Sequence, residues 1–545
     1  MLAIHYSSVN LSGTAREVFG LQVAIANWLK AFFRYGTPEK FHFLIGNPKD
    51  WSEVEQIAAE AGLDGKRLVA LDRRYARENF ANFKTIFRPD PHLHNILWQR
   101  QQLPAPGFNF CGLAHAIGGM ETGDLLEKYC LAPSEETDAI ICPSHAVKAA
   151  IRSFWDLYGD YLEQRFGAKF TCPVQLPVIP LGIDVARFEA LVTPDKRADQ
   201  RKKLGLAEDE VVLLWVGRLS HAIKAHPYAM FAAAERAAEK TGAKIHLVMQ
   251  GYFVPDEAET MFKKLAADFC TKAKVTFVAS DDKRFPDGLW ASGDIFLSLI
   301  DNMQESFGLT PIEAMAAGLP RVISDWDGYR DSVAHGEDGF LIRTTQPPPG
   351  SGHALSELLL SGREMYGGFL GKSAMSVAVD IDQAAEAIAL LATDKNKRKS
   401  VADRARQRAR EIYDWRNIIP AYENLWREMA AKRSAAKKQW VSALPQVPDP
   451  FTMYASYPTA PLKETDRLFV VADTATIKKL WSHEINVFAL DIMIPPDEAT
   501  QLINAISAEG GKTAGDIMRQ FPNFNTSRVW RTLTWLLKLG ILRQA

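Results

Sequence analysis

Two carboxylates, Glu305 and Glu313, stand eight positions apart in the segment ESFGLTPIE, which covers residues 305–313. Ionised carboxylates accept hydrogen bonds, so the pair could bind hydroxyl groups of a ligand. Between them, Gly308 allows the backbone to approach a ligand closely, and Pro311 suits the first turn of a helix. The pattern predicts a strand that ends in a polar loop, followed by a helix whose start faces a hydroxyl-bearing ligand.

The start of this predicted helix offers backbone amides as well as side chains. Unpaired N–H groups and the helix macrodipole together bind phosphate at a helix N-terminus. The amides available here belong to Phe307, Gly308, Leu309 and Thr310. They could neutralise a diphosphate and take the place of the divalent metal that many nucleotide-sugar enzymes use.

A second group of polar residues follows the apolar run at residues 211–216. Gly217 stands where the backbone must turn, and Arg218 and Lys224 come after it. In open α/β sheets ligands bind at the carboxyl ends of the strands, where a planar guanidinium and a compact ammonium suit a diphosphate. Taken alone, the pattern also fits two surface cations that follow a strand.

Short apolar runs alternate with helical patterns, which is typical of parallel sheets with crossover helices. We therefore expect two α/β domains in tandem. A first series comprises residues 2–6, 18–33, 41–45 and 51–61, and a second comprises residues 211–216, 228–240, 245–249, 275–278, 295–299 and 321–324. Residues 346–376 contain three consecutive prolines and several glycines, so we expect a surface loop there.

The composition is that of a multidomain globular protein. Of 545 residues, 47% are hydrophobic and 24% charged, and the net charge of −1 removes any global attraction to nucleic acid or membrane. The five scattered cysteines favour reduced thiols, and no export signal or membrane anchor is predicted, so we expect a cytoplasmic protein. The basic run at residues 393–410 fits a solvated helix face, with a weak peripheral contact to the inner face of an anionic membrane as the alternative.

Three motifs together resemble the family-four retaining glycosyltransferases. They are the Glu-x7-Glu pattern at 305–313, Gly-Arg-Leu-Ser at 217–220 with its following lysine, and WDGYRDSV at 326–333. The resemblance covers about residues 1–430. It implies the GT-B fold, an α/β architecture in which two Rossmann-like domains face each other across a cleft.

The resemblance also implies a domain plan. An N-terminal acceptor domain would cover residues 1–188 and take up a return helix at 412–432, and a nucleotide-sugar donor domain would cover residues 189–411. A proline-rich linker is predicted at 433–466. Residues 467–545 contain three helical patterns and resemble a small, mainly α winged-helix domain.

The C-terminal segment raises the question of nucleic acid binding. Residues 512–545 contain six cations against the single acid Asp516, which makes DNA binding conceivable. However, Trp530, Leu533, Leu536 and Leu537 have the spacing of a buried helix face, and the remainder of the segment balances the charge. We favour a module that docks a protein or a substrate over one that binds nucleic acid.

The resemblance assigns roles to individual residues. It implies that Glu305 binds the donor hexose, that Glu313 binds the ribose, and that Arg218 and Lys224 hold the diphosphate. His115 would face the sugar from the N-terminal domain, with a histidine bonded to a backbone carbonyl near a strand end as the alternative. Asp331 stands where the family usually has glutamate. The loop on the acceptor side would contain Ser12, Gly13 and Thr14.

No metal or other cofactor is expected. Asp325-Trp-Asp327 and Asp380-Ile-Asp382 match the bare Asp-x-Asp signature of metal-dependent transferases, but such tripeptides arise readily by chance, and aspartate before residues 383–391 suits a helix cap.

The expected activity is therefore retaining transfer of a hexose from a nucleotide-diphosphate sugar to a hydroxyl acceptor, such as a glycan or lipid-linked glycan. The alternatives are a nucleotide-sugar epimerase and a nucleotide-sugar-binding regulator that acts through the winged helix. A phosphorylase would need a pyridoxal-phosphate lysine, and no segment resembles one.

Overall fold

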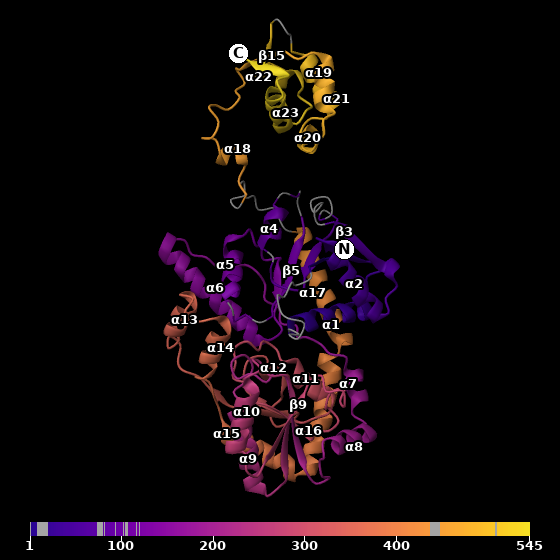
Figure 1. The fold of residues 1–545 in the computed structure, drawn as a ribbon, viewed down its shortest axis with the longest axis vertical. Coiled ribbons are helices and arrows are strands. Elements are labelled where there is room, and N and C mark those ends of the chain that lie inside the picture. Colours follow the sequence, from indigo (N-terminus) through magenta and orange to yellow (C-terminus); the bar gives the residue numbers. More distant parts are fainter. Residues whose placement is uncertain are drawn as a thin grey trace. The chain divides into compact units, whose positions relative to one another are not determined.

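The computed structural model describes residues 2–7, 20–72, 80, 82–92, 94–101, 103, 107–115, 117–118, 120–435, 447–506 and 510–545. The chain divides into two compact units, residues 1–441 and residues 442–545. The larger unit contains two parallel six-stranded sheets, each flanked by helices (Figure 1).

The first sheet has the strand order β3-β2-β1-β4-β5-β6, and all of its neighbouring strands are parallel. Its strands are β1 (Leu2–Tyr6), β2 (Phe41–Ile45), β3 (Leu68–Asp72), β4 (Thr85–Arg88), β5 (Asn109–Leu113) and β6 (Ala139–Ile141). Its helices are α1 (Gly20–Tyr35), α2 (Pro48–Ala61), α4 (His94–Arg100), α5 (Met120–Leu131) and α6 (His145–Phe166).

The second sheet has the order β12-β11-β10-β7-β8-β9, again parallel throughout. Its strands are β7 (Val211–Val216), β8 (Ile245–Gly251), β9 (Lys274–Ala279), β10 (Ile295–Ser298), β11 (Arg321–Ser324) and β12 (Gly339–Ile342). Its helices include α9 (Tyr228–Thr241), α10 (Ala258–Phe269), α11 (Leu309–Ala316), α12 (Tyr329–Ser332), α15 (Ile381–Thr393) and α16 (Lys395–Arg408).

Both sheets follow the same order when their strands are counted from the first. The first and fourth strands are neighbours, β1 with β4 and β7 with β10, and the chain extends from them in opposite directions. This is the order of doubly wound nucleotide-binding folds, whose ligands bind at the carboxyl ends of those two strands. Two Rossmann-like sheets were predicted, and the structure confirms them.

The chain crosses between the two sheets twice, and the two crossings are hydrogen bonded to each other. The amide of Ile183 donates to the carbonyl of Tyr413 at 2.8 Å, and the amide of Trp415 donates back to Ile183 at 3.2 Å. Helix α17 (Trp415–Ala435) then packs on α1, with the rings of Trp28 and Tyr422 5.7 Å apart. The paired crossings are the natural hinge between the two α/β domains.

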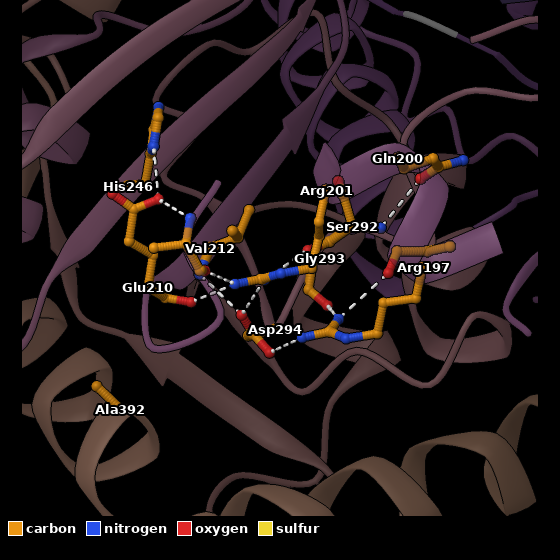
Figure 2. Close-up of polar contacts among 12 residues, drawn as sticks. Arg197, Gln200, Arg201, Glu210, Val212, His246, Ser292, Gly293, Asp294 and Ala392 are labelled. Atoms are coloured by element: carbon orange, nitrogen blue, oxygen red, sulfur yellow. Dashed lines mark hydrogen bonds and ion pairs between the residues drawn. The ribbon is translucent and has the colours of Figure 1, made fainter. Parts of the chain in front are cut away.

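The entry into the second domain is fixed by a buried polar cluster beneath the sheet (Figure 2). Helix α7 (Val185–Leu191) leads to α8 (Pro194–Lys203). From α8, Arg197 and Arg201 donate to the two carboxylate oxygens of Asp294 at 2.6 and 3.2 Å. Asp294 also accepts the Val212 amide at 2.9 Å. Because α8 is tied to the sheet, we expect any hinge motion to be confined to residues before it.

The segment predicted as a surface loop, residues 346–376, is instead helical. It contains α13 (His353–Leu360) and α14 (Tyr366–Ala374), and β13 (Thr344–Thr345) pairs with β14 (Ala378–Val379) at its base. The prolines and glycines misled the prediction because they lie before and between the helices, and because the glycines of α14 permit close packing.

The basic segment forms α16, as its helix-forming composition suggested. Its cations contact the second domain: Lys397 donates to the carbonyl of Gly336 at 2.9 Å, and Arg408 lies 3.6 Å from Asp338. No described helix has the length and apolarity that a bilayer crossing requires.

The smaller unit combines a three-stranded antiparallel sheet with helices. The sheet has the order β16-β15-β17 and covers a core that includes Leu468, Leu502, Leu533 and Leu536. Its elements are α18 (Pro450–Met453), β15 (Arg467–Val470), α19 (Thr474–Trp481), α20 (Glu484–Val487), η4 (Leu490–Ile492), α21 (Pro496–Asn504), β16 (Lys512–Thr513), α22 (Ala514–Gln520), α23 (Thr526–Lys538) and β17 (Leu542–Gln544). The last three helices were predicted; α19, α20 and the sheet were not.

Candidate functional site

The two polar segments identified in the sequence meet at the switch point of the second sheet. Gly217 directly follows β7 and precedes Arg218 and Lys224, while β10 leads into the loop that carries Glu305. Because β7 and β10 are neighbours, parallel pairing brings both loops to the same edge. Residues 81 positions apart therefore face each other there.

Lys224 and Glu305 form an ion pair that is largely shielded from water. Burial lowers the pKa of Lys224, but the charge of Glu305 outweighs burial and leaves the lysine pKa above its ordinary value. Among the described residues, no carboxylate pairs with Arg218. The site thus holds one neutralised cation and one cation available to an anionic ligand.

A short network fixes the loop that carries Lys224. Asn302 donates through its amide nitrogen to the carbonyl of Ala222 at 2.7 Å, and Asp301 accepts the amide of His226 at 3.2 Å. Burial raises the pKa of Asp301 to about 7. Neither residue was predicted from the sequence, although an Asp-Asn pair directly after a buried strand was a usable signal.

The start of α11 has the conformation that the sequence suggested. Gly308 precedes the helix with φ 86°, and a methyl group placed on it would lie 2.1 Å from the ring of Tyr329. Pro311 has no N–H, so Leu309 and Thr310 supply the unpaired amides of the first turn. The side chain of Phe307 is buried and faces Tyr413, with ring centroids 6.2 Å apart.

Glu305 lines a cavity of about 510 Å³ between the two α/β domains. The second domain supplies its polar wall and the first domain an apolar wall. The lining residues are Ile117, Ala146, Val147, Ala150, Met303, Glu305, Asp325, Trp326, Asp327, Arg330, Thr344 and Gln346. A wall of carboxylates opposite an apolar wall suits a ligand with a hydroxyl face and a C–H face.

Glu313 opens into a different, smaller cavity of about 220 Å³ beside the hinge. Leu309, Arg187 and Trp415 also line it. Burial raises the pKa of Glu313 to about 7, against the opposing charges of Arg187 and Lys224. Glu305 and Glu313 therefore line different cavities on either side of the first turn of α11. A ligand that binds both carboxylates must extend across this turn.

His115 follows β5 and is bonded to a backbone carbonyl, the alternative that the sequence left open. Its Nε2 lies 2.9 Å from the carbonyl oxygen of Pro89, so Nε2 carries the proton. Burial lowers the pKa of His115, although Pro89 and Asp90 oppose this shift. The imidazole is neutral near pH 7, and Nδ1 remains as its acceptor. Ser12, Gly13 and Thr14 lie outside the described residues.

Asp327 lines the cavity, although the sequence indicated only a chance Asp-x-Asp tripeptide at this position. Its φ of 48° is the only positive value at a non-glycine residue in the described part of the chain. Burial and the nearby charge of Glu305 raise the pKa of Asp327 to about 8. A carboxyl group that keeps its proton near pH 7 can donate a hydrogen bond as well as accept one.

The other aspartates of the two tripeptides have structural partners. Asp325 accepts from Arg330 at 2.9 Å, and Asp380 caps α15 by accepting the Gln383 amide at 3.0 Å, as predicted. Across the described ranges, no group of three or more His, Cys, Asp or Glu side chains is placed to hold a metal ion.

The two domains touch at the N-terminus of α6. Ser144 donates to the carbonyl of Ser306 at 2.8 Å, and the His145 amide donates to the carboxylate of Asp331 at 2.7 Å. The His145 ring nitrogen Nδ1 lies 3.1 Å from the same oxygen. A carboxylate of the second domain thus occupies the anion-binding end of a first-domain helix.

Comparison with known families agrees with this site. Residues 196–365 match the family model described as "Glycosyl transferases group 1". The matched segment contains Arg218, Lys224, Glu305 and Glu313, which are all the charged residues predicted to bind the donor.

Curated relatives match over a similar region. A D-inositol 3-phosphate glycosyltransferase of Geodermatophilus obscurus is 31% identical over 179 residues, which is 32% of this chain and 38% of the relative. A second protein of that name, from Catenulispora acidiphila, is 31% identical over 219 residues, 39% of this chain and 49% of the relative. The chain thus matches less than half the length of either relative.

Solved structures resemble this chain at low sequence identity. Anabaena HepE in complex with UDP is 15% identical, with a TM-score of 0.48, and the match covers 78% of this chain and 99% of that one. A glycosyltransferase of Rickettsia africae is 13% identical, with a TM-score of 0.49 and coverage of 78% and 98%. The architecture of the chain is defined by its two strand orders.

Proposed function

We propose that this chain, whose residues 196–365 match the group 1 glycosyl transferase model, transfers a hexose from a nucleotide-diphosphate sugar to a hydroxyl acceptor with retention of configuration. The observation that carries the proposal is the shielded Lys224–Glu305 pair at the switch point. Arg218, which pairs with no carboxylate in the described part of the chain, lies on the same loop as Lys224, and the first-turn amides of α11 follow the loop of Glu305. The arrangement combines a hydroxyl acceptor with a cluster of positive charge.

The donor would lie across the start of α11. Its diphosphate would contact Arg218, Lys224 and the amides of Leu309 and Thr310, its hexose would bind Glu305, and its ribose would bind Glu313. When the diphosphate arrives, it competes with Glu305 for Lys224. Glu305 is then released to accept hydrogen bonds from the hexose hydroxyls, so donor binding rearranges the ion pair.

The main chemical contribution of the protein is stabilisation of the leaving diphosphate. As the bond between the anomeric carbon and the phosphate oxygen breaks, negative charge grows on the diphosphate, and fixed cations and amides stabilise it without reorganising. These groups supply the positive charge that a divalent metal would otherwise bring. The acceptor hydroxyl attacks the anomeric carbon from the same face of the sugar and passes its proton to the departing diphosphate oxygen, while His115 faces that sugar from the first domain.

Two other functions remain as candidates. An epimerase would convert the nucleotide sugar without an acceptor, and a regulator would bind it without turnover. A regulator of this kind would bind DNA through the smaller unit. The contacts of two arginines there count against DNA binding, because Arg528 and Arg531 donate to the backbone carbonyls of residues 491–493. We favour a docking role for this unit, toward a protein or the acceptor, over a role on DNA.

Product analysis after incubation with UDP, GDP and ADP sugars distinguishes the three functions. A transferase releases the nucleoside diphosphate and forms a glycoside when acceptors are supplied. An epimerase yields a new nucleotide sugar, and a regulator shows ligand-induced thermal stabilisation without any product. Absence of both binding and turnover across the panel would refute the proposal.

A further inference from the structure

The helical segment that replaces the predicted loop packs directly on the candidate site. A methyl group placed on Gly371 of α14 would lie 3.1 Å from the backbone of Ala222, in the loop that carries Lys224. A methyl group placed on Gly367, one turn earlier, would lie in ordinary contact with the side chain of Ile223, at 3.8 Å. Glycine on this face of α14 lets the helix approach the loop closely, so the segment is a wall of the site.

The same helix also reaches the first domain. A methyl group placed on Gly118 would lie 3.3 Å from the hydroxyl oxygen of Tyr366 and 3.5 Å from the side chain of Leu370. Gly118 lies three positions beyond His115 on the loop after β5. Helix α14 therefore bridges the two loops from which the proposed donor contacts arise, and Tyr366 lies at the point where it meets the first domain.

The surroundings of the Tyr366 hydroxyl point to an anionic ligand. The side chain is half-buried and its hydroxyl makes no hydrogen bond to any other described residue. Tyr366 adjoins Gly367, which faces Ile223 on the loop between Arg218 and Lys224. Burial raises the pKa of Tyr366, and the positive charge of Arg218 acts in the opposite direction. Within the described part of the chain Arg218 also has no carboxylate partner. One anion placed between them would satisfy both donors.

We propose that Tyr366 is a further donor-binding residue, whose hydroxyl donates a hydrogen bond to the diphosphate of the nucleotide sugar opposite Arg218. The assignment rests on the proposed function, because it needs a nucleotide sugar in the cleft. It gives the segment 346–376 a role in substrate binding, with α14 held on the Lys224 loop so that the phenol is correctly placed.

The test compares Tyr366→Phe, which removes only the hydroxyl oxygen, with Tyr161→Phe on the exposed face of α6. Isothermal titration measures the affinity of each variant, and of Arg218→Ala, for UDP, GDP and ADP and for the corresponding monophosphates. A hydrogen bond to a charged group contributes roughly 1.5–3 kcal/mol, so Tyr366→Phe should weaken binding of the preferred diphosphate about tenfold or more. Binding of the monophosphate should change little, and Tyr161→Phe should match the wild type.

Each outcome has a distinct meaning. Equal losses for the diphosphate and the monophosphate in Tyr366→Phe would overturn the assignment to the diphosphate. Wild-type affinity in Tyr366→Phe together with a loss in Arg218→Ala would overturn the role of Tyr366 and leave the proposed function standing. Failure of the wild-type protein to bind any of the nucleotides would overturn the proposed function itself.

Discussion

Glu305 and Glu313 differ in what surrounds their carboxylates, and this difference separates their behaviour. Glu305 is neutralised by Lys224. Glu313 lies in the smaller cavity, where Arg187 is the positive charge that lowers its pKa most. Burial outweighs that charge and raises the pKa of Glu313 to about 7. An ionised Glu313 is therefore destabilising until a ligand donates hydrogen bonds to it.

Glu313→Gln should alter stability in a pH-dependent way. The folded-state pKa of about 7 exceeds the ordinary value of 4.5, so between these values the folded protein binds more protons than the unfolded chain. The stability contribution of Glu313 consequently falls as pH rises through this window. Removing the charge should raise the Tm at pH 8, by an amount equivalent to at most about 3 kcal/mol, and have little effect at pH 5.

Thermal unfolding at several pH values measures this difference. Glu357→Gln is the matched control, because Glu357 is an exposed carboxylate on α13. Its effect on Tm should be small at every pH. A Tm change in Glu313→Gln that is the same at pH 5 and pH 8 would contradict the raised pKa.

Among the elements, α11 depends most on one backbone conformation. Gly308→Ala would place a methyl group into the Tyr329 ring at a positive φ, so the loop before the helix must move. We expect at least a tenfold loss of nucleoside-diphosphate affinity by isothermal titration. Gly242→Ala shares a positive φ of 67° but has open space around it, so it should cost stability without changing affinity. Equal affinities in the two variants would exclude a role for the α11 start.

The first turn of α6 contacts the second domain through the carboxylate of Asp331. The His145 amide has no acceptor within its own helix and donates to Asp331. Asp331→Ala should therefore accelerate hydrogen exchange in a peptide that spans residues 144–150, as measured by mass spectrometry. Asp156→Ala, at an exposed position on the same helix, should leave exchange there unchanged. Unaltered exchange in Asp331→Ala would mean that the domains do not stay closed in solution.

The clamp on α8 should be required for stability. Removing the carboxylate of Asp294 leaves Arg197, Arg201 and the Val212 amide without their common acceptor (Figure 2). Losing one member of a buried ion pair costs about 3–5 kcal/mol, so Asp294→Ala should lower the Tm markedly. Asp209, which pairs with Lys244 on the exposed surface, is the control, and Asp209→Ala should leave the Tm nearly unchanged. Similar Tm values for the two variants would refute the clamp.

Across the whole molecule, the sequence was most informative where one local pattern decides one element. The apolar runs that form β1, β2, β7 and β11 and the glycine before α11 are of this kind.

Long-range packing was the part that the sequence could not supply. The pairing of Lys224 with Glu305 depends on β7 and β10 being neighbours, and no local pattern records that. Helix α14 was missed because its glycines are unfavourable for an isolated helix and are explained only by the Ala222 loop that packs on them. Asp327 was missed because its raised pKa comes from burial in a cavity formed by two domains.

The turnover of a nucleotide sugar in the presence of EDTA tests the central claim most directly. The wild-type protein should release nucleoside diphosphate and form a glycoside with chelator present, because Arg218, Lys224 and the α11 amides supply the positive charge. Glu305→Ala and Lys224→Ala should each lose most of this activity while keeping a cooperative thermal transition. Full activity in either folded variant, or a wild-type activity that EDTA abolishes, would contradict the account.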